Sequence, residues 1–249
     1  MRRPKAAVVS GGTCGIGRAL VEALVDDGYR VGFSGRVRER VEAVVTSVAS
    51  RHPHRIVGIT GDASLPGHAT ALITAVRETF PAWASVYVLC AGQGLPGTLT
   101  GSDPARWEAL LHLNLLGAMH QMRECAALFG QMPEGVRDLV VIGSTVGRTL
   151  SDANPVYGAT KVALHSLVEA LRRERCATGV RVSLIEPGFV VSGFQASAGY
   201  DPEWFAGIER EQGPLLRPED IARVVRFIVQ QPPHVHIDDV RVRPTRQRV

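Results

Sequence analysis

Short runs of aliphatic and β-branched residues alternate with longer amphipathic stretches along the chain. Such runs predict strands, whereas apolar positions three and four residues apart predict helices. Strand–helix alternation at this spacing is typical of an α/β fold, so we expect a doubly wound, seven-stranded parallel sheet with helices on both faces. The predicted strands cover residues 5–9, 30–34, 56–60, 86–89, 136–142, 180–185 and 236–240, and the predicted helices cover about 15–27, 37–50, 67–79, 104–129, 154–177 and 218–230.

Two segments depart from this alternation. Residues 189–216 carry glycine, serine and aromatic residues without clean periodicity, and we expect them to form a mobile lid over a substrate. Residues 232–249 hold the last predicted strand and a C-terminal tail. Because no interior linker or internal repeat interrupts the chain, we interpret residues 1–249 as a single domain.

The composition is that of an ordinary globular protein, with 45% hydrophobic and 21% charged residues among 249. No apolar run approaches the roughly 20 residues that cross a bilayer, so we expect no membrane partner. The basic start, Met1 to Lys5, is followed only by Ala6 to Val9 before a glycine cluster. That stretch is too short for the apolar core of a signal peptide, and we expect a cytoplasmic protein.

The net charge of +4 raises the question of a nucleic-acid partner. The positive charges are dispersed, and in residues 169–175 arginines alternate with glutamates. Such a pattern is typical of a solvated or subunit-contacting helix face, so we expect no nucleic-acid binding. Neither the four cysteines nor the histidine pairs at 52/54 and 234/236 have metal-ligand spacing, and we expect no metal site.

A glycine cluster, Ser10-Gly11-Gly12-Thr13-Cys14-Gly15-Ile16-Gly17, follows the first predicted strand and opens the first helix. Glycines allow a tight turn and let the backbone approach a pyrophosphate, while the helix N-terminus offers free N–H groups and a partial positive charge. This placement predicts a dinucleotide site, and a plain tight turn is the alternative. The residues expected to contact the dinucleotide here are Gly11, Thr13, Cys14, Gly15, Ile16 and Gly17.

The end of the second predicted strand bears on which dinucleotide binds. NAD binding usually uses an acidic residue there for the ribose 2′-hydroxyl, but Phe33-Ser34-Gly35-Arg36 has none. Arg36 can instead hold a 2′-phosphate through charge-assisted hydrogen bonds or stack on adenine. We therefore predict NADP(H) in preference to NAD(H). The alternative is that Arg36 only begins a basic helix with Arg38 and Arg40.

Tyr157 and Lys161 are four residues apart in a predicted helix, so they project from the same face. A free tyrosine has a pKa of about 10 and a lysine about 10.4. A nearby ammonium favours the phenolate and moves the pKa of the phenol toward the working pH. The pair can then donate a proton to an alkoxide or remove one from an alcohol, although this spacing alone equally fits a surface pair.

Two further polar residues accompany the pair. Ser144 follows the fifth predicted strand, at the edge of the sheet where ligands bind, and its hydroxyl can hydrogen-bond a substrate oxygen. Asn114 interrupts the leucine-rich stretch 110–116. A polar amide on an apolar helix face needs partners, so Asn114 is either a helix-bend or water-binding residue or a plain core amide.

With these residues in place, the chain resembles the classical short-chain dehydrogenases/reductases over essentially its whole length. Each matching stretch is short, but their ordered combination is specific. The resemblance implies a Rossmann-type fold that binds NAD(P)(H), with a serine–tyrosine–lysine triad extended by an asparagine. The matching stretches are Ser10–Gly17, Asp62-Ala63, Cys90-Ala91-Gly92, Asn114, Ser144, Tyr157–Lys161 and Pro187-Gly188.

The resemblance implies a role for each matching position. Tyr157 is expected to be the general acid/base, and Lys161 to lower its pKa and hold the nicotinamide ribose. Ser144 is expected to orient the substrate oxygen, and Asn114 to hold a water that links Lys161 to solvent. The implied cofactor contacts are Asp62 at the adenine, Val190 at the nicotinamide amide, and Ala63, Ala91, Gly92, Pro187 and Gly188 along the same site, with Ser192 where the family often has threonine.

The chain also departs from the family pattern. Leu89-Cys90 replaces the usual paired asparagines, and Ser10 stands where threonine is commoner. Neither change touches a reacting group. The stretches 156–161, 185–188 and 234–247 resemble a narrower branch that includes NADP-dependent 3-hydroxy acid (serine-type) dehydrogenases. Because family members usually assemble through the helices near 104–129 and 154–177, we expect a homodimer or homotetramer.

Three functions remain open at this point. The first is an NADP(H)-dependent oxidoreductase that transfers hydride between nicotinamide and a small-molecule ketone or secondary alcohol. The second is a specific 3-hydroxy acid dehydrogenase, which needs a cation for the carboxylate; Arg148 is the nearest candidate, and a surface role is its alternative. The third is a non-catalytic dinucleotide-binding sensor or scaffold, against which the four intact catalytic groups argue.

Overall fold

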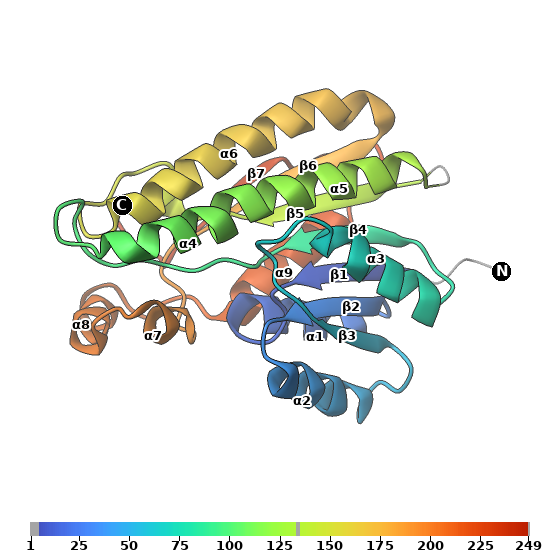
Figure 1. The fold of residues 1–249 in the computed structure, drawn as a ribbon, viewed down its shortest axis with the longest axis horizontal. Helices are drawn as coiled ribbons and strands as arrows, with labels where there is room; N and C mark the ends of the chain where they lie inside the picture. Colours follow the sequence, from blue (N-terminus) through green and yellow to red (C-terminus); the bar gives the residue numbers. More distant parts are fainter. Residues whose placement is uncertain (1–4, 133–134, 249) are drawn as a thin grey trace.

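The computed structural model describes residues 5–132 and 135–248, so the expectations for the first four residues and for Val249 lie outside it. Within these residues a seven-stranded parallel sheet runs through the molecule (Figure 1). Its strands are β1 (Ala6–Ser10), β2 (Arg30–Gly35), β3 (Ile56–Thr60), β4 (Ala84–Leu89), β5 (Arg137–Ile142), β6 (Val180–Pro187) and β7 (Asp239–Val242). The spatial order β3-β2-β1-β4-β5-β6-β7 reverses at β1, which confirms the doubly wound prediction.

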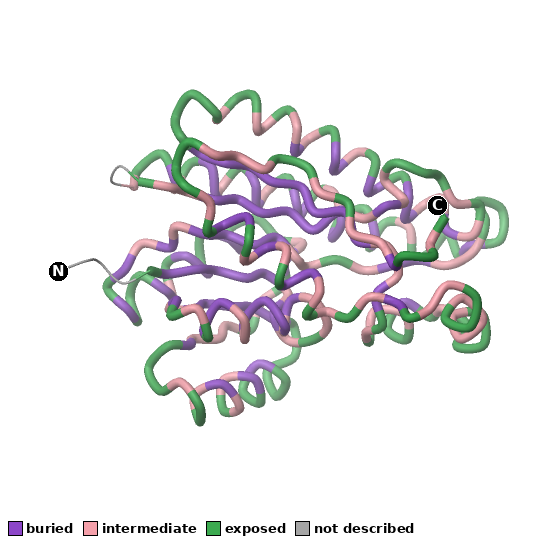
Figure 2. Tube along the Cα trace, turned by 180° about the vertical axis from the view of Figure 1, so that it is seen from behind, coloured by how far each residue is buried: buried purple, intermediate pink, exposed green. Residues whose placement is uncertain are grey.

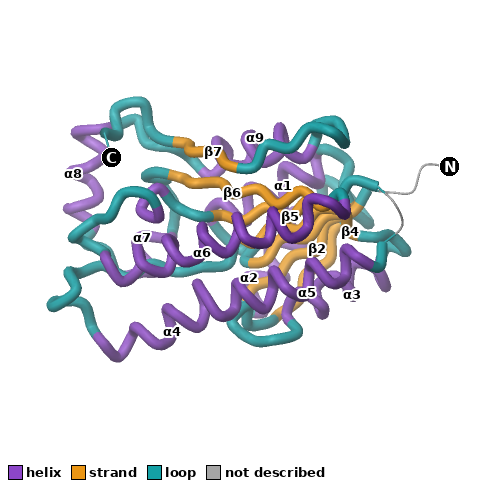
Figure 3. Tube along the Cα trace, turned by 90° about the horizontal axis from the view of Figure 1, so that it is seen from above, coloured by secondary structure: helices purple, strands orange, loops and turns teal. Residues whose placement is uncertain are grey.

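Helices cover both faces of the sheet (Figures 1 and 3). The α-helices are α1 (Gly15–Asp26), α2 (Arg38–Ala49), α3 (His68–Thr79), α4 (Trp107–Leu111), α5 (Ala118–Gly130), α6 (Pro155–Arg175), α7 (Phe194–Ala198), α8 (Pro202–Gln212) and α9 (Pro218–Val229), with 3₁₀ turns η1 (Pro104–Arg106), η3 (Thr145–Gly147) and η4 (Cys176–Thr178) and a π-helical turn η2 (His112–Gly117). Helices α1, α2 and α9 pack on one face, and α3, α5 and α6 on the other. None of the described helices has the length and apolar character needed to cross a membrane.

The sheet lies between two apolar clusters, one on each face. Side chains alternate along β1: Ala7 and Val9 join the cluster with α1, α2 and α9, whereas Ala6 and Val8 join the cluster with α3, α5 and α6. Every residue of β1 and of β6 is buried, as expected for parallel strands covered on both faces (Figure 2). This double coverage explains why the strands read as continuous apolar runs in the sequence.

The single helix expected over residues 104–129 is wrong in detail. The structure has η1, α4, the π-helical turn η2 and α5 in succession. Asn114 lies in η2, and its side chain bonds the backbone of Gln93 in both directions, at 2.9 and 2.8 Å. A π-helical turn adds a residue to the helix and re-aims the side chains around it, often at a functional site.

The seventh strand also differs from its prediction, since it covers Asp239–Val242 and not 236–240. Preceding residues are held by other bonds: the guanidinium of Arg181 donates to the carbonyl of Val235 at 2.8 Å, and the His236 ring bonds the carbonyl of Val182 at 3.0 Å. These contacts draw the backbone away from ladder geometry until Asp239.

The segment 189–216 contains two helices, α7 and α8, although its sequence lacks clear periodicity. Both lie beyond the carboxyl ends of the strands, at the same end of the molecule as the C-terminal tail (Figures 1 and 3). The expected lid therefore has the right position, and its mobility stays a prediction.

Candidate active site

A cavity of about 560 Å³ opens at the carboxyl ends of the strands; we call it the active-site cavity. Ligands of doubly wound sheets bind at this edge, near the point where the strand order reverses. Asp62 and Asn114 are the two predicted site residues that do not line it. The predicted residues that do line it are Gly11, Thr13, Cys14, Gly15, Ile16, Gly17, Arg36, Ala63, Ala91, Gly92, Ser144, Tyr157, Lys161, Pro187, Gly188, Val190 and Ser192.

The glycine turn is shaped by close backbone approaches. Gly11 has φ +76°, and a Cβ there would lie 2.8 Å from the Cα of Ala91. A Cβ at Gly17 would lie 2.1 Å from the carbonyl oxygen of Gly11. Helix α1 begins directly after this turn without a side-chain cap at Cys14, so its first N–H groups stay available to an anion. The turn thus fits a phosphate group.

A buried pair that the sequence analysis missed supports this turn. The N–H of Gly11 donates to Ser34 Oγ at 3.3 Å, and Ser34 Oγ lies 2.9 Å from His68 Nε2. Burial lowers the pKa of His68, so its ring is neutral at neutral pH and can share a proton with the serine hydroxyl. His68 is 34 residues away from Ser34, and no local pattern points to the contact.

Two arginines line the cavity beyond β2. Arg36 and Arg40 are both exposed, and both contribute to the wall beside Thr13 and Gly35. Only Arg36 was expected here from the sequence. Arg36 lies in the turn after β2 and Arg40 in the first turn of α2, so the path of the backbone between the two elements, and not a shared helix face, brings both to the cavity.

Asp62 lies beside the cavity and not on its wall. Its carboxylate accepts hydrogen bonds from the backbone N–H of Ser64 at 2.9 Å and from its hydroxyl at 2.8 Å. The bond from the Ser64 backbone is the main cause that lowers the pKa of Asp62. Its neighbours Gly61 and Ala63 form the wall there, so Asp62 caps a turn that shapes this end of the cavity.

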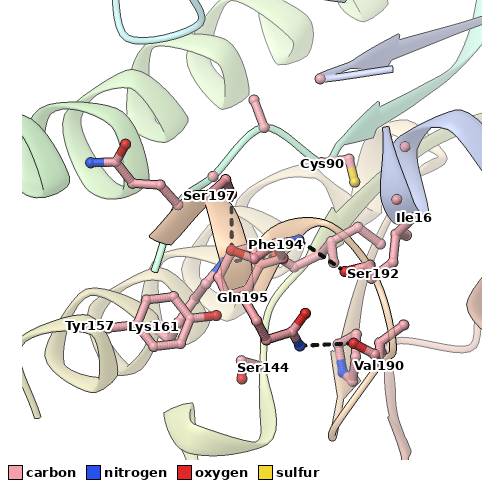
Figure 4. Close-up of a pocket in the computed structure, with 18 of the residues that line it drawn as sticks. Ile16, Cys90, Ser144, Tyr157, Lys161, Val190, Ser192, Phe194, Gln195 and Ser197 are labelled. Atoms are coloured by element: carbon pink, nitrogen blue, oxygen red, sulfur yellow. Dashed lines mark hydrogen bonds between the residues drawn. The ribbon is translucent and has the colours of Figure 1, made fainter. Parts of the chain in front are cut away.

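Tyr157 and Lys161 lie together on the first turns of α6, as their spacing predicts (Figure 4). Both are buried, and Lys161 Nζ lies 5.8 Å from the centre of the Tyr157 ring. The same Nζ donates to the carbonyl of Ile142, at the end of β5, at 3.1 Å. The helix and the sheet thus fix the amine jointly.

The charge states of the pair differ from the expectation. Burial raises the pKa of Tyr157, against the opposing effect of a hydrogen bond with the Ser144 side chain. Burial also lowers the pKa of Lys161 to about 8. The phenol pKa is therefore raised in this structure and not lowered as expected, because desolvation outweighs the hydrogen bond that lowers it.

Ser144 lies at the start of η3, where its turn closes around a histidine ring. The Ser144 N–H donates to His165 Nε2 at 3.4 Å, and a Cβ at Gly143 or Gly147 would lie 2.4 or 2.2 Å from that ring. Burial, together with the charges of Lys161 and Arg148, lowers the pKa of His165 to about 4. A neutral His165 thus accepts from the serine backbone and holds the turn, a contact across 21 residues that the sequence analysis missed.

Asn114 lies behind the cavity wall and is 2% exposed. Besides its two bonds to Gln93, its Nδ2 lies 3.3 Å from Thr160 Oγ1, next to Lys161 in α6. The amide connects the end of β4 to the helix that carries the reactive pair. Asn114 is both buried, as expected for a core amide, and part of a π-helical turn, as expected for a helix-bend residue. The water that it was expected to hold stays a prediction.

Arg148 points away from the active-site cavity. Its guanidinium bonds Glu186 Oε1 at 2.9 Å and forms an ion pair with Asp239. It lines a separate cavity of about 500 Å³ against α6 and β7. Glu186 is fully buried immediately before Pro187, and its burial raises the pKa of its carboxyl. The position expected for a carboxylate-binding cation is therefore taken up by a structural ion pair.

The remaining wall comes from the 189–216 segment and is largely aromatic. The ring of Phe194 lies 5.9 Å from that of Tyr157, and Tyr200 stacks on Trp204 at 5.5 Å. Asn154 Nδ2 bonds Tyr200 Oη at 2.9 Å and so links this wall to the start of α6.

The C-terminal tail also reaches the cavity. Gln247 lines it, and its Oε1 accepts from the N–H of Phe189 at 3.1 Å, directly after Gly188. Sequence reasoning treated the tail as a strand with an extension, since nothing in the local pattern places position 247 beside position 189.

Fold and site together define an α/β protein built to hold a dinucleotide beside a buried tyrosine and lysine. Residues 5–202 match the family model described as short chain dehydrogenase, and the chain belongs to this family of oxidoreductases. An uncharacterized oxidoreductase of Staphylococcus saprophyticus is 30% identical over 240 residues, which cover 96% of this chain and 97% of that protein.

Solved structures agree with this assignment. The closed form of serine dehydrogenase complexed with NADP⁺ superposes with a TM-score of 0.84 at 25% identity, covering 98% of this chain and 96% of that one. An NADPH-bound short chain oxidoreductase from Pseudomonas aeruginosa, described as containing an atypical catalytic center, has a TM-score of 0.84 at 27% identity and covers 98% and 97%.

Proposed function

We propose that this protein is an NADP(H)-dependent oxidoreductase that interconverts a ketone and a secondary alcohol, with Tyr157 as the general acid/base. The observation that carries the proposal is the meeting of Tyr157, Lys161 and Ser144 in the cavity that begins at the glycine turn. The third hypothesis, a non-catalytic sensor, leaves this buried acid/base arrangement without a use.

The cavity suits a nicotinamide dinucleotide in its residues and its charges. The glycine turn and the uncapped start of α1 would hold the pyrophosphate, and Arg36 with Arg40 would hold a ribose 2′-phosphate. The backbone at Val190 and the tail-supported turn at Gly188 would face the nicotinamide amide. The NADP⁺ and NADPH complexes of the structural relatives support the choice of cofactor.

A bound NADPH would supply the hydride to the carbonyl carbon. Tyr157 would donate its proton to the carbonyl oxygen as negative charge develops there. Its raised pKa keeps the phenol protonated at neutral pH, which suits the reduction direction. Ser144 would donate a hydrogen bond to the same oxygen, and Lys161 would hold the ribose and replace the proton lost from the phenol.

The variant Tyr157→Phe tests the mechanism. It removes the one hydroxyl that delivers the proton, so we expect kcat to fall at least about a hundredfold. The dissociation constant for NADPH, measured by fluorescence titration, should change less than about twofold. Tyr29→Phe is the matched control, because Tyr29 is also buried but does not line the cavity.

Near-normal turnover by Tyr157→Phe would remove the proposed mechanism. NADPH binding by the unmodified protein, with no turnover across a broad carbonyl panel, would instead favour the sensor. We also propose a homodimer or homotetramer, which is tested at the scale of the whole molecule below.

A further inference from the structure

The charges on the cavity wall are distributed unevenly. Among the described residues that line it, the charged ones are Arg36, Arg40, Asp152 and Lys161. Both arginines lie beyond β2, and Lys161 is bonded to the carbonyl of Ile142. No lining residue of the 189–216 segment is charged, and the remaining charged residue on the described wall is an acid, Asp152.

Arg148, which follows the serine turn, cannot be recruited at low cost. Arg148 neutralises the fully buried Glu186, and turning it into the active-site cavity would leave that carboxylate unpaired. The ion pair with Glu186 therefore keeps Arg148 out of the cavity. A substrate carboxylate against the wall formed by residues 189–216 would lose its water without gaining a counter-charge from that wall.

Uncharged groups form the rest of the substrate side. Phe194, Tyr200 and Trp204 present aromatic surface next to Tyr157, and Leu150 lies at the rim with 74% of its surface exposed. Gln195 bonds the carbonyl of Val190 (Figure 4). Three amide oxygens of wall residues have no hydrogen-bond partner among the described residues, and their partial negative charge also disfavours an anion: Asn154 Oδ1, Gln195 Oε1 and Gln212 Oε1.

We infer that the substrate is an uncharged carbonyl compound with an aromatic or branched apolar substituent, and not a hydroxy or keto acid. The inference rests on the proposed function and deepens it by naming the substrate class. In the reaction the ketone carbon gains a hydride from NADPH, which is oxidised to NADP⁺, and the carbonyl oxygen gains the proton of Tyr157. Phe194, Tyr200 and Trp204 would contact the aromatic or branched substituent that the carbonyl carbon carries.

A matched pair of ketones tests this inference. Methyl 4-oxo-4-phenylbutanoate and its free acid, 4-oxo-4-phenylbutanoate, share the ketone and the phenyl ring and differ in one charge. With NADPH at saturation, we expect kcat/KM for the ester to exceed that for the acid at least about tenfold, since the wall formed by residues 189–216 offers the carboxylate no cation.

A designed cation should reverse part of that preference. Leu150→Arg places a guanidinium at the rim, so the ester-to-acid ratio should fall about tenfold through a gain with the acid. Leu99→Arg is the matched control: Leu99 is 60% exposed and does not line the cavity, and the ratio should stay unchanged.

The outcomes separate this inference from the proposed function. If the unmodified protein prefers the acid, or reduces other carbonyl compounds but not the ester, the proposed substrate class is wrong. The proposed ketone–alcohol interconversion would still hold. An equal change of the ratio in both arginine variants overturns the charge argument. Failure to reduce any carbonyl compound, with NADPH bound, overturns the proposed function itself.

Discussion

At the scale of single residues, we propose that Arg36 determines the preference for NADP(H) over NAD(H). It lies on the cavity wall where a ribose 2′-phosphate would be placed, and a hydrogen bond to a charged group contributes about 1.5–3 kcal/mol. We expect Arg36→Ala to raise the dissociation constant for NADPH at least about tenfold and to leave that for NADH nearly unchanged. Fluorescence titration with both coenzymes measures this.

Arg38→Ala is the control for Arg36→Ala. Arg38 is exposed two residues further on, at the start of α2, but does not line the cavity, so its loss changes the net charge equally without removing a contact. Equal weakening of NADPH and NADH in Arg36→Ala, or an equal effect of the control, would contradict the role assigned to Arg36.

Residue-scale prediction from sequence succeeded where the contact is local. Tyr157 and Lys161 share a helix face because they are four positions apart, and the glycine turn lies between consecutive elements. Contacts between distant positions were missed: Ser144 with His165, and Phe189 with Gln247 across 58 residues. The role of Arg148 was left open between a carboxylate-binding cation and a surface residue for the same reason, since its partner Glu186 is 38 residues away.

At the scale of elements, the Arg148–Glu186 pair ties the serine turn to β6. In Arg148→Met, Glu186 would be buried without its cation. Because the Arg148 side chain is 43% exposed and its charge is partly screened by solvent, we expect a loss of roughly 1–3 kcal/mol in unfolding free energy at neutral pH. The pKa of Glu186 is already raised by burial, and losing Arg148 raises it further. The pKa of Glu186 is thus higher in the folded protein than in the unfolded chain. Its contribution to the unfolding free energy is fully present at pH values below the pKa of the unfolded chain, and it is lost as the pH rises through the pKa of the folded protein.

The deficit of Arg148→Met relative to the unmodified protein should therefore be larger at pH 8 than at pH 5. Urea unfolding at both pH values measures it. Adding Glu186→Gln removes the buried charge, so the double variant should recover much of the loss at pH 8. A deficit independent of pH would show that packing, and not charge, is what Arg148 contributes.

Element types were predictable where strands such as β1 and β6 are buried on both faces and where the helices that pack on the sheet have one apolar side; the edge strands β3 and β7 are only partly buried. The first and last residues of the helices and strands were harder to predict, since hydrogen bonds between residues far apart in the sequence determine them. The tail before β7 is held by Arg181, which belongs to another strand, and the helix around Asn114 loosens into a π-helical turn where its amide bonds Gln93. Neither partner is visible in the local pattern of the sequence.

At the scale of the whole molecule, the helices on one side of the sheet expose apolar side chains. Leu111 on α4, Leu116 on η2, Met119 on α5 and Val162 on α6 are each 40–42% exposed. Apolar surface of this kind is typical of a contact between protein chains, and it lies on the helices for which we predict assembly. We therefore expect a mass in solution of two or four times 26.8 kDa by light scattering.

Met119→Glu tests this assembly directly. A glutamate buried in an interface would lose its water without a partner, so we expect the variant to shift toward the 26.8 kDa monomer. Phe227→Glu is the control, because Phe227 is 59% exposed on α9, which packs on the opposite face of the sheet from α5 and α6. If the unmodified protein is a monomer, the proposed assembly does not exist. If it is an oligomer whose mass is unchanged in Met119→Glu, the contact between chains lies elsewhere. A loss of mass in Met119→Glu but not in the control would assign the contact to this helical face.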